Sequence, residues 1–198
     1  MMSKSTFKKT AIDNLISNLR GEVGEIIASW ILMRDYMIIS KQLSSPNIKE
    51  DIDNQELVRI HITIDVFRND IISRLSELSE KTFSQVNFYF ASQKLKILQS
   101  EVLEFQKYIK NSKFKDRRNE YISHKKLPPN WEDHRAPHRI SYKTLLRGIA
   151  FSVILMKKFD SYFLGPIAKK QWMILRKKRY NLTSPPSVAF ILLPYYRK

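Results

Sequence analysis

The sequence predicts an all-α protein built as an up-and-down helical bundle. Over long stretches the apolar residues recur at intervals of three and four, which is the spacing of a helix that buries one face. Of the 198 residues, 43% are hydrophobic and only four are glycine. So few glycines argue against a turn-dense β-sandwich and against a glycine-rich phosphate loop.

The first two expected helices are the longest. We predict one over residues 10–40 and a second over residues 53–81, separated by the Ser44–Asn47 turn. Gly21 and Gly24 lie one turn apart on the first helix, and small residues there permit close approach of another helix. The expected buried residues are Ile12, Leu15, Ile16, Leu19, Val23, Ile26, Ile27, Trp30, Ile31 and Met33, then Leu57, Ile60, Ile64, Phe67, Ile71, Ile72, Leu75 and Leu78.

Three further helices are expected after a short aromatic stretch that runs from Phe83 to Phe90. We place them at residues 92–109, 114–124 and 141–163. Prolines break the second of these, and Gly165-Pro166 closes the last. The bundle then covers residues 1–164, and residues 165–198 form a basic C-terminal arm that carries the apolar segment Val188–Leu193.

The charge is distributed unevenly along the chain, whose net charge is +16. Residues 1–66 carry a net charge of −1, residues 67–132 carry +5 and residues 133–198 carry +12. A basic C-terminal half beside a neutral N-terminal half indicates a polyanionic partner, with nucleic acid first and an acidic membrane second. On this interpretation the C-terminal arm packs on the bundle or on RNA.

Several classes of site are excluded or disfavoured. Cysteine is absent, which excludes disulfides, thiolate metal sites and cysteine nucleophiles. His134 and His138 lie in a proline-containing loop without a second pair of ligands, so we predict no metal site and no cofactor. The N-terminus lacks an apolar signal segment and no apolar run reaches membrane-spanning length, so we expect a cytoplasmic protein.

The residues that carry chemistry lie in the basic stretch FKDRRNEYISHKK, residues 114–126. Arg118, Asn119 and His124 are the candidate catalytic residues. A guanidinium can bind phosphate oxygens at two points, and a histidine can transfer protons near neutral pH. The candidate RNA-binding residues are Lys115, Arg117, Lys125 and Lys126, together with Arg176, Lys177, Lys178 and Arg179 of the arm.

An arginine followed by a small polar residue, with a histidine about five positions later, resembles the signature of HEPN ribonucleases. The stretches GEVGEIIASWILMRDY and DVFRNDIISRLSELSEK resemble the abortive-infection U-type HEPN family over residues 10–160. The resemblance implies a toxin or antiphage effector that cleaves RNA without metal, by attack of the 2′-hydroxyl on its own phosphate. The products would be a 2′,3′-cyclic phosphate and a 5′-hydroxyl end.

The resemblance also implies a partner, either an antitoxin or a nucleotidyltransferase. Some HEPN toxins carry a tyrosine two residues after the histidine, which the nucleotidyltransferase modifies. Lys126 stands at that position here, so that mode of neutralisation is not expected.

Arg118 and His124 are six positions apart, about 240° around an α-helix, so they do not share a face. We therefore expect a two-fold homodimer that brings two copies of the motif around one composite cleft. Arg117 competes for the catalytic role because it lies seven residues before His124, on nearly the same face. Arg118 is preferred because Asn119 follows it.

Alternatives remain for the whole chain and for its other polar residues. A catalytically inactive HEPN-like module could bind RNA or a protein through its basic half, and a membrane-surface role is a third reading. His61 is interpreted as an ordinary packed or surface histidine. The polar patch Asp65, Arg68, Asn69 and Asp70 fits either a layer that supports the site or a solvated or ion-paired face.

Overall fold

The computed structural model describes residues 4–44, 54–83, 86–119 and 140–164. Within these ranges all regular secondary structure is helical, which confirms the all-α prediction. The helices are α1 (Lys4–Leu43), α2 (Asn54–Leu78), α3 (Phe88–Leu95), α4 (Gln99–Asn111), α5 (Phe114–Arg117) and α6 (Tyr142–Leu164). The predicted C-terminal arm lies outside the described residues.

Three of the predicted helices are confirmed. The ranges 10–40, 53–81 and 141–163 correspond to α1, α2 and α6 with small shifts at their ends. The apolar faces predicted for them supply most of the buried core, because almost every residue expected inside is buried or partly buried. The three- and four-residue spacing thus identified both the helices and their inward faces.

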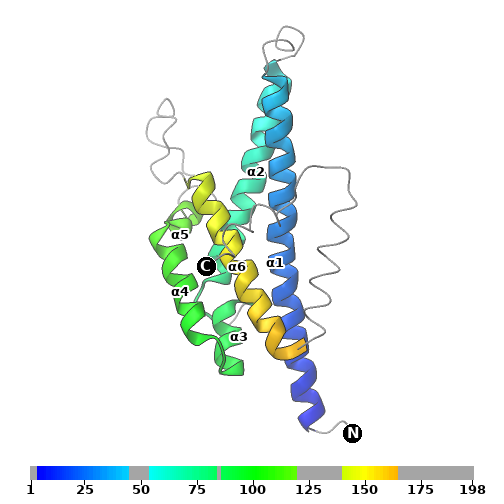
Figure 1. Cartoon of the computed structure of the whole chain (residues 1–198), viewed down its shortest axis with the longest axis vertical. Coiled ribbons are helices and arrows are strands. Elements are labelled where there is room, and N and C mark those ends of the chain that lie inside the picture. The colour runs from blue at the N-terminus through cyan, green and yellow to red at the C-terminus, as the bar shows by residue number, and fades with distance from the viewer. Residues whose placement is uncertain (1–3, 45–53, 84–85, 120–139, 165–198) are drawn as a thin grey trace.

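α1 and α2 form a long antiparallel pair, and α6 packs against the part of α1 nearer its N-terminus (Figure 1). α3, α4 and α5 pack along the remaining side of α6 and α2. Two contacts mark where α6 begins: the rings of Trp30 and Tyr142 lie 4.8 Å apart, and Arg68 Nη2 donates to the carbonyl of Ile140 at 2.8 Å. Beyond that level, α1 and α2 project as a two-helix hairpin.

Aromatic contacts and an ion pair join α1, α3, α4 and α6 below the projecting hairpin. Phe88 of α3 stacks on Phe159 of α6 with 5.9 Å between ring centroids and meets Phe105 of α4 edge-on at 5.4 Å. All three rings are fully buried. Asp160 is also buried, and Arg20 Nη2 of α1 donates to its Oδ1 at 2.7 Å, which joins α1 to α6.

The predicted third helix, residues 92–109, is wrong. The chain forms two helices there, α3 and α4, and Phe88–Phe90 begin the first of them instead of connecting helices. Lys96 and Leu98 both have φ of 55°, in the left-handed region, which no α-helix continues through. Ile97 and Leu98 at this break pack against the core, and burial of their side chains offsets the cost of the left-handed backbone.

The close approach that Gly21 and Gly24 would permit does not occur among the described residues. Both glycines are exposed, and a Cβ added at either would meet nothing within 4 Å. A close approach occurs instead at Gly148 of α6, where a Cβ would lie 3.1 Å from Leu75 Cδ1 and 3.2 Å from Phe114 Cζ. No spacing pattern marks this position, because Gly148 stands alone within an apolar run.

Gly148→Ala and Gly24→Ala should therefore change stability in opposite directions. The added methyl of Gly148→Ala must displace two fully buried side chains, which we expect to cost about 1–2 kcal/mol. Gly24→Ala adds a methyl in open space on a helix, which should stabilise by about 0.5–1 kcal/mol. Urea unfolding of both variants beside the wild type measures the difference, and equal stabilisation by both would contradict the tight packing around Gly148.

Candidate functional site

The segment with the candidate catalytic residues is anchored by Phe114, the first residue of α5. Its ring is fully buried, and it contacts Tyr108 of α4 at 6.5 Å between ring centroids. Lys113 precedes it with φ of 59°, a left-handed turn that redirects the chain after α4. The edge of the Phe114 ring packs directly against Gly148 of α6, where a larger side chain would clash. This packing places α5 against α2 and α4.

The predicted helix over residues 114–124 is confirmed at its start, and residues 120–124 lie outside the described part of the chain. α5 is α-helical over Phe114–Arg117, and the backbone then widens into a π-helical turn at Arg118 and Asn119. Wide turns of this kind occur often at functional sites. The expected angle of about 240° between Arg118 and His124 requires a regular α-helix, and the α-helix ends at Arg117. Residues 120–126 lie outside the described part of the chain, including His124, Lys125 and Lys126.

Arg118 is held in an ion pair that the sequence analysis missed. Its Nη2 lies 2.7 Å from Oε1 of Glu80, which stands two residues after the end of α2. The two side chains are only 16% and 20% exposed, so the pair is largely shielded from water. Within such a setting an ion pair fixes the plane of the guanidinium more firmly than a surface pair would.

Asn119 completes this local arrangement. The Nε of Arg118 donates to Oδ1 of Asn119 at 3.3 Å. Arginine has five N–H donors, and these contacts occupy one on Nε and one on Nη2. The remaining donors of Arg118 and the amide NH₂ of Asn119 are the groups that could bind phosphate oxygens. The structure therefore brings two of the three candidate catalytic residues together and adds Glu80 to them.

Two candidate RNA-binding residues of α5 differ in exposure. Lys115 is exposed, whereas Arg117 is partly buried. A phosphate backbone can reach Lys115 without rearrangement, so Lys115 is the better surface contact of the two. The other basic candidates, at positions 176–179, lie outside the described residues.

In the polar patch on α2, Asp70 joins α2 to α1, and Asp65 pairs with Arg68 on the same helix. Asp70 accepts from Ser29 Oγ at 2.6 Å and from Arg74 Nε at 3.0 Å. Arg74 Nη1 also donates to Glu22 Oε2 at 2.8 Å. Asp65 is exposed, and its Oδ1 lies 3.7 Å from Arg68 Nη1. These contacts favour the ion-paired reading of the patch.

Only one of the three histidines interpreted as non-catalytic, His61, lies within the described residues. His61 is exposed on α2, which agrees with its reading as a surface residue. His134 and His138 lie outside the described residues. Within the described ranges, no three His, Asp or Glu side chains form a group that could hold a metal ion.

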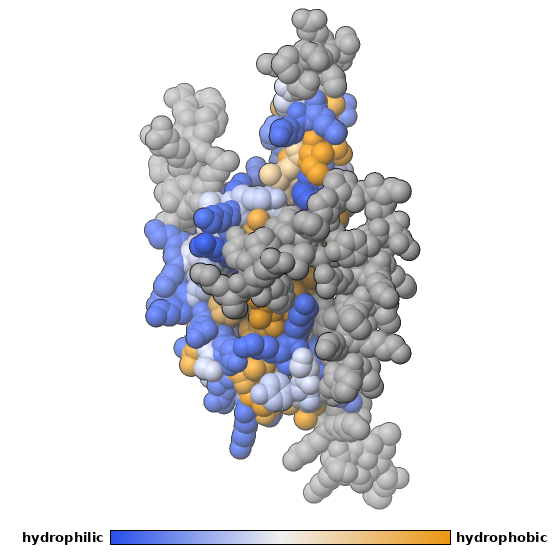
Figure 2. All heavy atoms as spheres, in the orientation of Figure 1, coloured by the Kyte–Doolittle hydropathy of each residue, from blue (hydrophilic) through white to orange (hydrophobic). Residues whose placement is uncertain are grey.

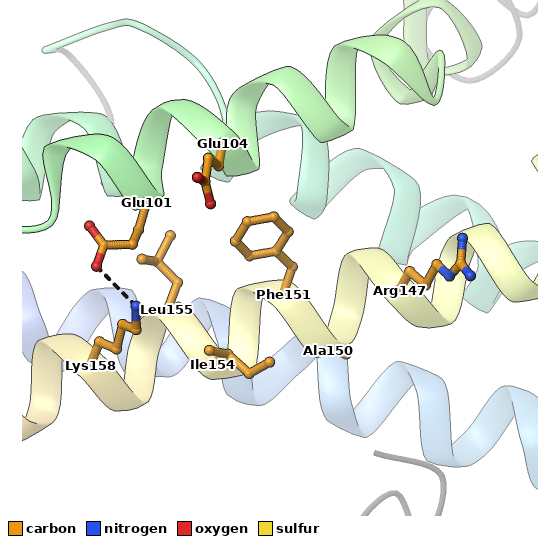
Figure 3. Close-up of a pocket in the computed structure, with 8 residues that line it drawn as sticks. All are labelled: Glu101, Glu104, Arg147, Ala150, Phe151, Ile154, Leu155 and Lys158. Carbon is orange, nitrogen blue, oxygen red and sulfur yellow. Dashed lines mark hydrogen bonds and ion pairs between the residues drawn. The ribbon is translucent and has the colours of Figure 1, made fainter. Parts of the chain in front are cut away.

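A groove of about 330 Å³ lies between α4 and α6 (Figure 3). Its floor is apolar, with the Phe151 ring between the two helices, and its rim carries Glu104 and Arg147. One end is closed by Lys158 Nζ, which donates to Glu101 Oε1 at 2.9 Å. That hydrogen bond, with those from the amide of Glu101 and from Ser100, lowers the pKa of Glu101 to about 2. None of the described candidate residues lines this groove.

Comparisons with known protein families, curated proteins and solved structures give no match. Among the described helices, none is both long and apolar enough to span a membrane. The function is therefore inferred from the residues and from the geometry around Arg118.

Proposed function

We propose that this protein is a metal-independent endoribonuclease of the HEPN type. The observation that carries the proposal is the arrangement of Arg118, Asn119 and Glu80 at a π-helical turn, at the head of the segment that contains His124. A shielded, oriented guanidinium beside an amide suits the recognition of a phosphate group. The sequence resemblance supplies the reaction class.

The proposed reaction transfers protons at two oxygens. The 2′-hydroxyl loses its proton as it attacks the adjacent phosphorus, and the 5′-oxygen of the next nucleotide gains a proton as the P–O bond breaks. His124 is the residue suited to one or both transfers. Arg118 stabilises the extra negative charge on the phosphate oxygens in the transition state. No metal ion is required for these steps.

Glu80 acts as a positioning residue in this proposal. By holding Nη2 it fixes the guanidinium plane, so that the remaining N–H donors keep one direction. Its negative charge also weakens ground-state binding of RNA phosphate. We therefore expect Glu80→Gln to bind RNA more tightly and to cleave it more slowly.

A second candidate function is RNA binding without catalysis, and the same ion pair favours it. Glu80 neutralises the charge of Arg118, so affinity for RNA would come from other residues, such as Lys115 and the basic positions beyond residue 133. The two proposals differ in one measurable result, the appearance of new RNA ends. In the cell, the ribonuclease would act as a toxin or abortive-infection effector with an antitoxin partner.

Purified protein incubated with a defined single-stranded RNA in excess EDTA tests the proposal directly. The ribonuclease proposal predicts cleavage, an upstream fragment that ends in a 2′,3′-cyclic phosphate and a downstream fragment with a 5′-hydroxyl. Binding with no cleavage by the wild type would leave the RNA-binding module as the function. Cleavage that EDTA abolishes would overturn the proposed chemistry.

Replacement of Arg176, Lys177, Lys178 and Arg179 by alanine should weaken RNA binding and reduce its salt dependence. Each phosphate contact that is lost removes a released counterion, which lowers the slope of log affinity against log salt by about 0.7 for single-stranded RNA. Binding titrations at several salt concentrations measure this slope. An unchanged slope would show that these four residues do not contact RNA.

A further inference from the structure

The floor of the groove between α4 and α6 is built around an aromatic ring, that of Phe151. Phe105 meets this ring edge-on, with 5.4 Å between centroids, and the Tyr108 ring lies 6.2 Å from it. Both contacts come from α4, so they hold the ring in one orientation while the rest of it lines the groove (Figure 3). Figure 2 shows apolar surface along α6, beside the hydrophilic surface of α4. A fixed and partly exposed aromatic ring offers a surface on which a flat group can stack.

The rim of the groove carries charge of both signs. At one end Glu101 and Lys158 satisfy each other, with 2.9 Å between their charged atoms. Glu104 and Arg147 are exposed, and among the described residues neither side chain has a hydrogen-bond or ion-pair partner. In Figure 3 the carboxylate of Glu104 points into the groove beside the Phe151 ring, and Arg147 lies at the end opposite Lys158. A ligand stacked on the ring would therefore meet one available acceptor and one available cation.

The available cation lies at the end of the groove that adjoins α5. Gly148, next to Arg147 in the chain, packs on the ring of Phe114, the first residue of α5. α4 and α6 run antiparallel, so residues later on α4 and earlier on α6 lie at this same end. Exposed Lys107 of α4 and exposed Lys143 of α6 occupy those positions. Three cations thus flank the groove on the side of the candidate catalytic segment.

An unpaired nucleobase and its phosphates match these features better than a purely apolar ligand does. The bases of single-stranded RNA stack on aromatic side chains and present their Watson–Crick edges to hydrogen-bonding groups. The phosphates on either side of such a base attract cations, which the α5 end of the groove provides. The volume of about 330 Å³ lies at the lower end of the range for ligand sites. An apolar chain would cover the Phe151 ring but make no use of Glu104 or Arg147.

We propose that this groove binds an unpaired base of the RNA substrate, stacked on Phe151, and that it prefers guanine. The preference follows from Glu104. Among the four RNA bases, only guanine has two adjacent N–H donors on its Watson–Crick edge, and one carboxylate can accept from both. The other bases place acceptors on both sides of a single donor group or directly beside it, and a carboxylate repels those acceptors. Arg147 binds a phosphate next to the stacked base.

This inference rests on the proposed function in one respect, that RNA is the ligand, and it adds a preference for sequence. Arg118 follows a single turn of helix after Phe114, and Phe114 packs against the α6 residue next to Arg147. The phosphate at Arg118 and the base in the groove therefore belong to nearby nucleotides of one strand. Cleavage should then fall at a fixed, short distance from a guanosine.

Binding of RNA that cannot be cleaved tests the groove separately from the ribonuclease activity. The probes are a 2′-fluoro oligouridine and the same oligomer with one central guanosine, since 2′-fluoro RNA lacks the attacking hydroxyl. The full-length wild type should bind the guanosine oligomer about 5- to 100-fold more tightly. Glu104→Ala should remove most of this preference, whereas Glu25→Ala, which removes an exposed carboxylate from α1, should keep it. Arg147→Ala should weaken binding of both oligomers alike, because a phosphate contact does not distinguish bases.

The stacking surface is tested by Phe151→Leu, which keeps an apolar side chain but loses the ring. Its affinity for the guanosine oligomer should fall by about 5- to 100-fold. Tyr162→Leu, which removes a 65% exposed aromatic ring from the same helix outside the groove, is the matched control and should bind as the wild type does. Circular dichroism should show both variants folded. Equal binding of the two oligomers by the wild type, or an unchanged preference in Glu104→Ala, would overturn the inference.

Mapping the cuts in ordinary RNA distinguishes this inference from the proposed function. Cuts at one fixed distance from guanosine, lost in Phe151→Leu, would support both. Cuts placed without regard to guanosine would overturn the groove as a base-binding site and leave the ribonuclease in place. Guanosine-selective binding without any cuts would support the groove and remove the ribonuclease.

Discussion

His124→Ala should lower the rate of RNA cleavage by about 10²- to 10⁴-fold, the usual loss when a proton-transfer group is removed. The residue lies outside the described part of the chain, but it follows directly on the anchored segment that begins at Phe114. The rate is measured as single-turnover cleavage of a defined RNA in EDTA. Expression of the same variant should no longer arrest growth, if the protein acts as a toxin.

His61→Ala is the matched control for this experiment. His61 is an exposed histidine on the projecting hairpin, away from the Arg118–Glu80 pair. Its loss should leave the cleavage rate per protomer within about two-fold of wild type, a change below the loss of any catalytic group. Thermal unfolding of both variants should match the wild type. Full activity in His124→Ala would remove the proposed mechanism and favour the RNA-binding module.

The long helices were predictable because a helix that buries one face has apolar residues at a regular spacing of three and four. Val23, Ile26 and Trp30 on α1 repeat at three and four, and all are fully or almost fully buried. The spacing of apolar residues does not mark the break between α3 and α4. The break depends on a left-handed backbone at Lys96 and Leu98, where neither glycine nor asparagine marks the turn. Tertiary packing of the neighbouring apolar residues decides the conformation there.

The candidate site was predictable only in part, for a related reason. Arg118 and Asn119 are adjacent in a recognisable pattern, so the sequence was enough to select them. Glu80 lies in a polar stretch at the end of α2 and comes from 38 positions earlier in the chain. Only the packing of Phe114 against the bundle brings α5 to that helix end. A contact between distant elements that has no periodicity cannot be recognised from spacing.

Arg118 variants should separate the proposed catalytic role of the guanidinium from its structural role. Arg118→Ala is expected to lower the cleavage rate by about 10²- to 10³-fold, by analogy with the loss of an oxyanion donor. It should also destabilise the protein by about 1–3 kcal/mol, because the carboxylate of Glu80 is left without its partner in a shielded position. Arg118→Lys keeps a charge but loses the planar donor set, so it should recover stability more than activity.

The double variant Glu80→Ala/Arg118→Ala measures separately how Arg118 affects catalysis and how it affects stability. Removal of both charges relieves the unpaired carboxylate, so its free energy of unfolding should return toward that of the wild type. Its cleavage rate should stay as low as that of Arg118→Ala, because no guanidinium is present to stabilise the transition state. Lys115→Ala, which removes a neighbouring exposed cation, should weaken RNA binding with little effect on the single-turnover rate at saturating protein. If the double variant regains cleavage together with stability, Arg118 is a structural residue, and catalysis has to be assigned elsewhere.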